Sequence, residues 1–163
     1  MRMIRADTGF SGWRALRDLI ARSFAYMEPH LGHPARAVLS TEAELADEAA
    51  NGSVFVMIDG GAPVGCLFCR PSHDRADALY IGKLAVAASQ RGKGLARALV
   101  DAAARQARRQ GFTALTLDTG DAFDDLHRAF QKLGFGQPEP RPGEPGVVSM
   151  VRLIPPVSPP PTG

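Results

Sequence analysis

Apolar residues recur every three or four positions in three stretches of the chain, a spacing typical of helices that bury one face. The stretches are residues 11–26, 94–110 and 121–133. The stripe of the first stretch is made by Trp13, Leu16, Ile20 and Phe24. A fourth helix is predicted to end at Ala50. Ser40 or Thr41 can cap its start, and Glu44 stands where a capping box places an acid.

Strand-like patterns lie between these helices. Alternating or continuously apolar runs occur at residues 2–6, 53–58, 63–70, 78–86, 113–117 and 147–154. Asp59, Gly60 and Gly61 join the second and third runs, and such a sequence favours a tight hairpin. The run at 78–86 is almost continuously apolar, which predicts a central strand, and Gly82 within it allows a bulge.

The predicted order is βααββ followed by βαβαβ, which indicates an α/β protein of the α+β type. The 163 residues suit a single domain, which we assign to residues 1–154. Residues 155–163 contain five of the thirteen prolines and few apolar residues. They are predicted to form a disordered or extended tail.

The charge balance argues against a polyelectrolyte partner. Nineteen Lys and Arg against 17 Asp and Glu give a net charge of +2, so neither nucleic acid nor a membrane surface is an expected partner. No apolar run reaches the roughly 18 residues that span a bilayer, and residues 1–10 lack a signal-peptide pattern, so a cytoplasmic location is expected. Cys66 and Cys69 cannot build a disulfide framework and are interpreted as buried thiols.

A polar turn, residues 87–94, connects the central strand to the following helix. The first N–H groups of a helix have no intrahelical acceptor, and the helix dipole is positive there, so such a turn suits an anion. Gly92 and Gly94 let the backbone approach a phosphate. Arg91 and Lys93 add positive charge at the same place.

Two nucleotide-binding patterns fail at this turn because the spacing is wrong. A P-loop requires a glycine at position 87 and Ser or Thr after Lys93, but the chain has Ala87 and Gly94 there. A dinucleotide-binding fingerprint that starts at Gly92 needs a third glycine where Arg97 stands. Neither an ATPase nor a dinucleotide-binding role is therefore expected.

Two motifs resemble those of the GNAT superfamily of N-acetyltransferases. The first is Arg91-x-x-Gly94-x-Ala96, after a strand that ends at residues 84–86. The second is the segment 127–135, which ends in Lys-x-Gly-Phe. The resemblance covers nearly all of residues 2–154, and it implies the GNAT fold, a mixed, mostly antiparallel sheet flanked by helices.

The resemblance implies acetyl-CoA as a co-substrate, in a V-shaped gap where the 78–86 strand splays from the 113–117 strand. It implies that strand backbone binds the pantetheine arm and that amides of the turn bind the pyrophosphate. The expected CoA-binding residues are Leu84, Ala85, Val86, Arg91, Gly92, Lys93, Gly94, Leu95, Ala96 and Phe130.

The implied reaction is direct attack of a neutral amine on the thioester in a ternary complex. A backbone N–H near Leu84 is the expected oxyanion donor. Family members often have a carboxylate on the central strand, but residues 79–86 contain none. Tyr80, Asp118 or an ordered water is left as the general base, although Tyr80 also suits a packed aromatic and Asp118 a helix cap.

Phe130 departs from the pattern of the superfamily. Many members have a tyrosine at this position, two residues before the lysine of the Lys-x-Gly-Phe element, and its hydroxyl protonates the departing thiolate. Here water or another group must supply that proton, or the thiolate leaves unassisted. A thiol pKa of about 8.5 makes it a fair leaving group near neutral pH.

The resemblance assigns the loop after the first helix to the acceptor wall. Tyr26, Glu28 and His30 lie there, and Glu28 can bind a substrate ammonium. Each of the three also suits a solvated loop. His30 and His33 have a spacing that suits a metal, but without further ligands no metal site is expected. His127 is predicted on a partly exposed face of its helix.

We therefore expect an acyltransferase that moves the acetyl group of acetyl-CoA to a primary amine of a small molecule. The alternative is a non-catalytic acyl-CoA-binding sensor or regulatory module, which Phe130 and the missing strand carboxylate favour. DNA binding by the basic helix at 94–110 is a third alternative, although its apolar face is needed for the core. The strand at 147–154 can pair across an interface, so a homodimer is an open alternative.

Overall fold

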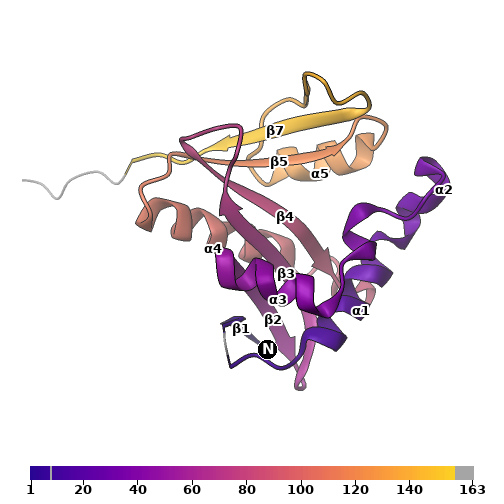
Figure 1. Cartoon of the computed structure of the whole chain (residues 1–163). Coiled ribbons are helices and arrows are strands. Elements are labelled where there is room, and N and C mark those ends of the chain that lie inside the picture. Colours follow the sequence, from indigo (N-terminus) through magenta and orange to yellow (C-terminus); the bar gives the residue numbers. More distant parts are fainter. Residues whose placement is uncertain (8, 157–163) are drawn as a thin grey trace, which may run out of the picture. The chain divides into compact units, whose positions relative to one another are not determined.

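The computed structural model describes residues 1–7 and 9–156 (Figure 1). Residues 157–163 of the predicted tail lie outside the described residues. The strands are β1 (Arg2–Arg5), β2 (Ser53–Asp59), β3 (Ala62–Pro71), β4 (Ala78–Val86), β5 (Ala114–Gly120), β6 (Glu139–Pro140) and β7 (Val147–Leu153). The α-helices are α1 (Trp13–Phe24), α2 (Glu28–Leu31), α3 (Glu42–Asn51), α4 (Leu95–Arg109) and α5 (Asp124–Lys132). The short 3₁₀ helices are η1 (Ala25–Met27), η2 (Arg36–Leu39) and η3 (Ala88–Gln90).

The strands form a mixed, mostly antiparallel sheet in the order β1-β2-β3-β4-β5-β7-β6. The pairs β1–β2, β2–β3, β5–β7 and β6–β7 are antiparallel, and β4–β5 is parallel. Both the predicted fold class and the central position of β4 are thereby confirmed. A central strand is covered on both faces, which is why its sequence is almost continuously apolar.

Two compact units make up the chain. The N-terminal unit consists of residues 1–70 and 81–103, and the C-terminal unit consists of residues 71–80 together with the chain from 104 onward. In the N-terminal unit, α1 and α3 share one core with β2, β3 and β4. The buried side chains of this core include Leu16, Leu19, Ile20, Leu45, Val54, Val56, Cys66, Phe68 and Ala85. The apolar stripe predicted for the first helix is therefore its buried face.

The first part of α4 lies on the opposite face of β3. Side chains alternate along a strand, so Gly65 lies on the other face from Cys66. A Cβ placed on Gly65 would lie 3.3 Å from Leu99 Cδ1 of α4. The N-terminal unit therefore has helices on both faces of its strands.

Two local sequence signatures form the structures they predict. Asp59 pairs with Ala62 across the hairpin, and Gly60 and Gly61 occupy the turn with φ of 59° and 80°. Thr41 rather than Ser40 caps α3. Thr41 Oγ1 accepts the N–H of Glu44 (3.1 Å), and Glu44 Oε1 accepts the N–H of Thr41 (3.4 Å), which completes the capping box.

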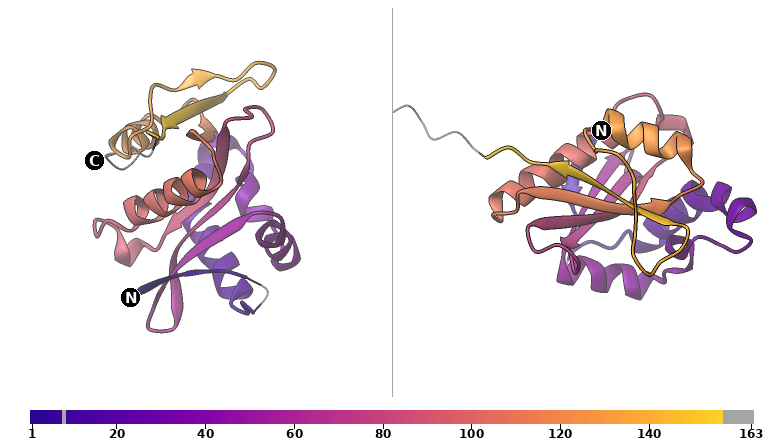
Figure 2. Two further views of the ribbon diagram at one scale, coloured as in Figure 1. Left: turned by 90° about the vertical axis from the view of Figure 1, so that its left-hand side faces the viewer. Right: turned by 90° about the horizontal axis from the view of Figure 1, so that it is seen from above.

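In the C-terminal unit, β5 and β7 pair along their whole length and lie side by side (Figures 1 and 2). The beginning of β4 pairs with β5 over three residues, and the last of these pairs is Tyr80 with Thr116. Residues in register share a face, and residues two apart on a strand do so as well. Tyr80, Thr116 and Asp118 therefore lie on one face of this sheet, and Leu115 and Leu117 lie buried on the other.

Some predictions about elements are wrong. Residues 28–31 are one helical turn, α2, because Pro29 suits a first turn and Gly32 ends it with φ 75°. β5 extends to Gly120 rather than ending at Leu117, because its pairing with β7 continues. The strand β6 was not predicted, since two residues carry no periodic pattern.

Candidate functional site

The turn between β4 and α4 has the backbone shape of an anion cradle. The N–H of Ala87 donates to the Val64 carbonyl oxygen (2.8 Å), which fixes the end of β4 to β3. After η3, Gly92 and Gly94 have φ of 80° and 79°, a region that residues with a Cβ rarely adopt. Apart from each glycine and its two chain neighbours, no described atom lies within 4 Å of a Cβ placed on Gly92 or Gly94. The backbone conformation, rather than crowding, therefore requires glycine at both positions.

α4 begins directly after this turn. The N–H of Ala98 donates to the Gly94 carbonyl oxygen (3.0 Å), so the N–H groups of Leu95 and Ala96 precede the first bonded turn. The positive end of the dipole of this 15-residue helix lies at the same point. Arg91 and Lys93 are exposed beside it. Backbone donors, helix dipole and cations here all favour an anion such as a pyrophosphate.

The backbone of β4 is distorted at Lys83, one residue after the glycine that the sequence indicated. Among the described residues, Lys83 is the only non-glycine residue with a positive φ, 49°. Its side chain is 17% exposed, and its Nζ contacts both carboxylate oxygens of Glu48 on α3 (2.7 and 2.9 Å). Its carbonyl oxygen accepts the Cys66 thiol (3.3 Å). Main chain and side chain of Lys83 are thus both fixed to neighbouring elements.

This distortion directly precedes the residues expected to contact CoA through their backbone. Ala85 belongs to the core, and Leu84 and Val86 are partly exposed. A left-handed residue interrupts the regular geometry of a strand and redirects the peptide that follows. The distortion of the strand backbone at Lys83 therefore lies directly before Leu84.

Tyr26, one of the predicted acceptor residues, lies near the turn. Partial burial raises the pKa of Tyr26, and the positive charge of Arg91 acts in the opposite direction. The fold thus brings the end of the first helical segment close to the glycine turn. Glu28 and His30 are exposed on α2.

Asp118 lies within β5 and does not cap a helix. Arg141 Nη1 donates to its Oδ2 (2.6 Å), and Ser149 Oγ donates to its Oδ1 (2.6 Å). Phe123 occupies the N-cap of α5 and makes no side-chain cap. The interpretation of Asp118 as a helix cap is therefore wrong, because β5 continues beyond it and the helix begins later.

Tyr80 shares the sheet face of Asp118 and is partly buried. Its neighbour in register, Thr116, donates its hydroxyl to the Met150 carbonyl oxygen (3.3 Å). With Ser149, which is in register with Asp118, these residues place several polar groups on this face of the C-terminal unit.

α5 carries two of the residues that the sequence singled out. The Phe130 ring meets the Phe135 ring edge to face, with centroids 5.8 Å apart, and is partly buried. His127 is buried rather than partly exposed, and its Nε2 donates to the Gly120 carbonyl oxygen (2.8 Å). The predicted exposure of His127 is wrong because α5 turns this residue toward the end of β5.

Both cysteines are buried in β3, as predicted. Burial raises the pKa of Cys66 and of Cys69 to about 12, so neither is a thiolate near neutral pH. Within residues 1–7 and 9–156, no group of three or more His, Cys, Asp or Glu side chains is placed to hold a metal ion.

Sequence reasoning missed the partners of the central strand and of Asp118. A lysine inside an apolar strand was a usable signal for Lys83, but its partner Glu48 lies on a helix far away in sequence. Arg141 stands in a segment rich in proline and glycine, and nothing in its surroundings distinguishes it. Only the folded chain shows what these charges contact.

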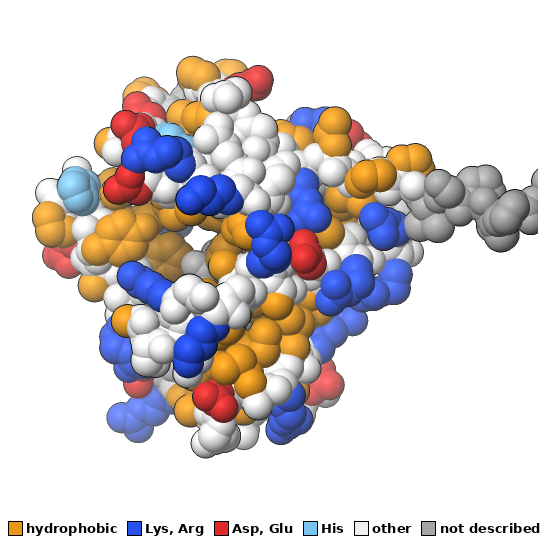
Figure 3. Space-filling model, turned by 180° about the vertical axis from the view of Figure 1, so that it is seen from behind, with side chains coloured by type: hydrophobic (Ala, Val, Ile, Leu, Met, Phe, Trp, Pro, Cys, Tyr) orange, Lys and Arg blue, Asp and Glu red, His pale blue; other side chains and the backbone are white. Residues whose placement is uncertain are grey.

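Basic side chains are spread over the face seen in Figure 3, with acidic side chains between them. This distribution agrees with the net charge of +2. None of the helices in the described part of the chain is long and apolar enough to cross a membrane.

Comparison with known proteins gives one family. The model of the acetyltransferase (GNAT) family matches residues 13–135. The rat protein "N-acetyltransferase family 8 member 2" (Rattus norvegicus) is 33% identical over 102 residues, which cover 58% of this chain and 45% of that protein. The match thus spans less than half the length of this relative.

Solved structures share the fold at low sequence identity. The PaiA N-acetyltransferase of Thermoplasma acidophilum, in complex with coenzyme A, aligns with a TM-score of 0.75 and 11% identity over 94% of this chain and 99% of its own. The ribosomal-protein-S18-alanine N-acetyltransferase of Escherichia coli aligns with a TM-score of 0.67 and 16% identity over 94% of both chains.

Proposed function

Because the chain belongs to the acetyltransferase (GNAT) family, we propose that it transfers the acetyl group of acetyl-CoA to a primary amine of a small molecule. The glycine turn at the start of α4 carries this proposal. It combines two left-handed glycines, a helix N-terminus and two exposed cations. The rat relative, named an N-acetyltransferase, supports an amine as acceptor.

Acetyl-CoA is proposed to bind with its pyrophosphate on the turn. The backbone amides from Arg91 to Ala96 would donate to the phosphate oxygens, and the helix dipole would favour the negative charge. The pantetheine arm would follow the backbone of residues 84–86. Phe130 is proposed as an apolar contact of the same co-substrate.

Acetyl transfer requires a base, an oxyanion donor and a proton for the leaving group. The amine nitrogen attacks the thioester carbonyl carbon, the C–S bond breaks, and a proton leaves the nitrogen. We assign the oxyanion donor to the Leu84 N–H and the base to Asp118, with Tyr80 as the alternative. Phe130 cannot donate a proton, so water protonates the thiolate, which is a fair leaving group with a thiol pKa of about 8.5.

The acceptor is proposed to be a small amine bound near the first helical segment. Tyr26 lies near Arg91, which supports a contact between this segment and a molecule bound on the turn. Glu28 and His30 are exposed on the adjoining helix and offer a carboxylate and an imidazole to an ammonium group. A cytoplasmic location fits this proposal.

Thiol release from acetyl-CoA tests the function directly. The purified protein is incubated with amino acids, polyamines, aminoglycosides and short peptides, and free CoA is measured with a chromogenic thiol reagent. Cys66 and Cys69 are buried, so protein thiols are expected to add little background. A reaction without amine serves as the blank for hydrolysis.

Calorimetry with CoA measures binding of the co-substrate separately from turnover, so that an enzyme can be distinguished from a sensor. Turnover with any amine class supports the proposal and identifies the acceptor chemistry. Tight CoA binding without turnover across the panel would favour the acyl-CoA sensor, for which the absence of a phenol at Phe130 is the specific observation. Absence of both binding and turnover would contradict both functions. Light scattering of the same sample tests the homodimer, and a species of 17.4 kDa would count against it.

A further inference from the structure

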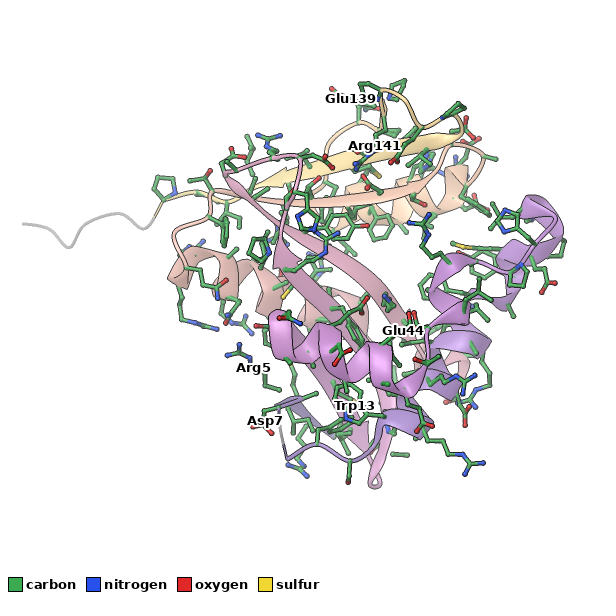
Figure 4. All side chains as sticks on the ribbon, in the orientation of Figure 1. Arg5, Asp7, Trp13, Glu44, Glu139 and Arg141 are labelled. Carbon is green, nitrogen blue, oxygen red and sulfur yellow. The ribbon has the colours of Figure 1, made fainter. Side chains whose placement is uncertain are left out.

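Arg141 lies between β6 and β7, in a short loop closed by its own backbone. Its N–H donates to the Val147 carbonyl oxygen (3.0 Å), and its carbonyl oxygen accepts the N–H of Glu144 (3.2 Å). The side chain is 23% exposed. Figure 4 shows Arg141 beside β7, with Glu139 on the chain just before it. The backbone of Arg141 is therefore fixed by hydrogen bonds of its own, independently of the contacts of its side chain.

The guanidinium group of Arg141 contacts three carboxylates from three segments of the C-terminal unit. Nη1 donates to Asp118 Oδ2 (2.6 Å), Nη2 donates to Asp74, and Nε contacts Glu144 Oε2 (2.9 Å). Since the guanidinium is planar and its donors form a rigid fork, the direction of each contact is defined by the plane of the group. Each of its three nitrogens has a carboxylate partner, so Arg141 is suited to orient a neighbouring carboxylate.

The three carboxylates differ in their environment. The side chains of Asp74 and Glu144 are at least half exposed, and exposed ion pairs contribute little to stability. Asp118 is 20% exposed and receives a second donor, the Ser149 hydroxyl, on its other oxygen (2.6 Å). The contact with Asp118 is therefore the one whose geometry is most restricted.

One donor on each oxygen still leaves Asp118 able to act. A carboxylate has about four lone-pair sites, of which these two contacts use two. A free lone pair can accept a proton from an amine or from a water that relays it. Asp118 is thus held in one orientation without being fully occupied.

We propose that Arg141 is a positioning residue that, together with Ser149, holds the Asp118 carboxylate in the orientation needed to accept the amine proton. This inference rests on the proposed function. Positioning of a base within hydrogen-bond reach of its proton is a condition for efficient general base catalysis. Arg141 meets this condition for Asp118 without touching the substrate.

Steady-state kinetics of Arg141→Gln and Arg141→Lys test the proposal, with an amine found active in the panel. Arg141→Gln is expected to lower kcat at least about tenfold, a part of the range a general base contributes, with the KM for acetyl-CoA unchanged. Arg141→Lys is expected to restore part of this loss, because it keeps the charge but not the fork. Loss of CoA affinity in step with kcat would instead indicate general damage and overturn the proposal.

A double-mutant cycle with Asp118→Asn shows whether Arg141 acts through Asp118. Asp118→Asn alone is expected to lower kcat by about 10² to 10⁴, and Arg141→Gln in that background is expected to add no further loss. Independent, multiplicative losses would overturn the proposal. Glu144→Gln is the matched control, since it removes another partner of Arg141 and should leave kcat within about twofold.

A crystal structure of Arg141→Gln gives a readout that needs no turnover. The Asp118 carboxylate is expected to leave its wild-type orientation, and an unchanged carboxylate would overturn the proposal. If the wild-type protein acetylates no amine in the panel, the proposed function fails by itself. The crystal structure then still decides whether Arg141 orients Asp118.

Discussion

Lys83 combines a left-handed backbone with a side chain that is fixed at its far end. A non-glycine residue in this region costs about 1–2 kcal/mol and persists only where the surroundings hold it. Here the restraints are Glu48 on the ammonium, Cys66 on the carbonyl oxygen and the Phe68 ring, 5.5 Å from Nζ. Such strain next to Leu84, the proposed oxyanion donor, fits a role in directing its N–H.

Comparison of Lys83→Gly with Lys83→Ala measures this strain. Both variants lose the contact with Glu48, but only alanine keeps a Cβ at φ 49°. We expect Lys83→Gly to have the higher free energy of unfolding, by roughly 0.5–1 kcal/mol after allowance for the greater flexibility of unfolded glycine. Urea unfolding of the two variants checks this, and a more stable alanine variant would mean that the backbone at position 83 is relaxed.

At the scale of elements, the glycine turn and α4 act as one unit. The turn supplies the left-handed positions, and the helix supplies a dipole and N–H groups that have no intrahelical acceptor. Gly94 is where the two meet, because its carbonyl oxygen accepts the first helical hydrogen bond from Ala98. A change of φ at Gly94 would therefore move the donors of the first turn.

Gly94→Val is expected to weaken CoA binding at least about tenfold, which corresponds to 1.4 kcal/mol. A β-branched residue does not tolerate φ 79° and would redirect the N–H groups that face the phosphates. Gly111→Val is a matched control, since Gly111 has φ 84° and equally open surroundings at the other end of α4. Calorimetry should show wild-type CoA affinity for the control, and equal affinities of the two variants would disprove the assigned cradle.

For the whole molecule, burial of the two thiols makes the free energy of unfolding depend on pH in the alkaline range. An unfolded cysteine has a pKa near 9.0, whereas burial raises the pKa of Cys66 and Cys69 to about 12. Between these values the unfolded chain loses protons that the folded protein keeps. The resulting stabilisation of the fold is complete below about pH 9 and is lost as the pH rises toward 12.

The free energy of unfolding should therefore fall as the pH rises above 9, by up to about 1.4 kcal/mol per pH unit for each thiol. Cys66→Ala is expected to show a shallower decline than the wild-type protein, because one titrating group is gone. Urea unfolding at several pH values between 8 and 11 checks this. Leu67→Ala, a buried neighbour without a titrating group, should keep the wild-type slope, and a wild-type slope in Cys66→Ala would contradict the prediction.

Patterns along the chain were sufficient to predict most elements, the central position of β4 and the place of the glycine turn. Helix and strand periods, capping boxes and tight turns depend on residues a few positions apart, so their signals are local. The hairpin at Gly60 and the cap at Thr41 formed as predicted for this reason. The two family motifs around Gly94 and Phe130 are also continuous stretches, and they were sufficient to indicate the family.

Contacts between residues far apart in the sequence became evident in the folded chain alone. Lys83 contacts Glu48, Asp118 contacts Arg141, and these contacts depend on how strands register and helices pack. The same packing buried His127 against Gly120, where its neighbours along the chain indicated exposure. The sequence around a charged or hydroxyl side chain does not indicate its distant partner, because pairing depends on distance in the folded protein rather than on spacing along the chain. The orientation of the proposed base was therefore decided by the fold, whereas the place of the proposed CoA turn was decided by the sequence.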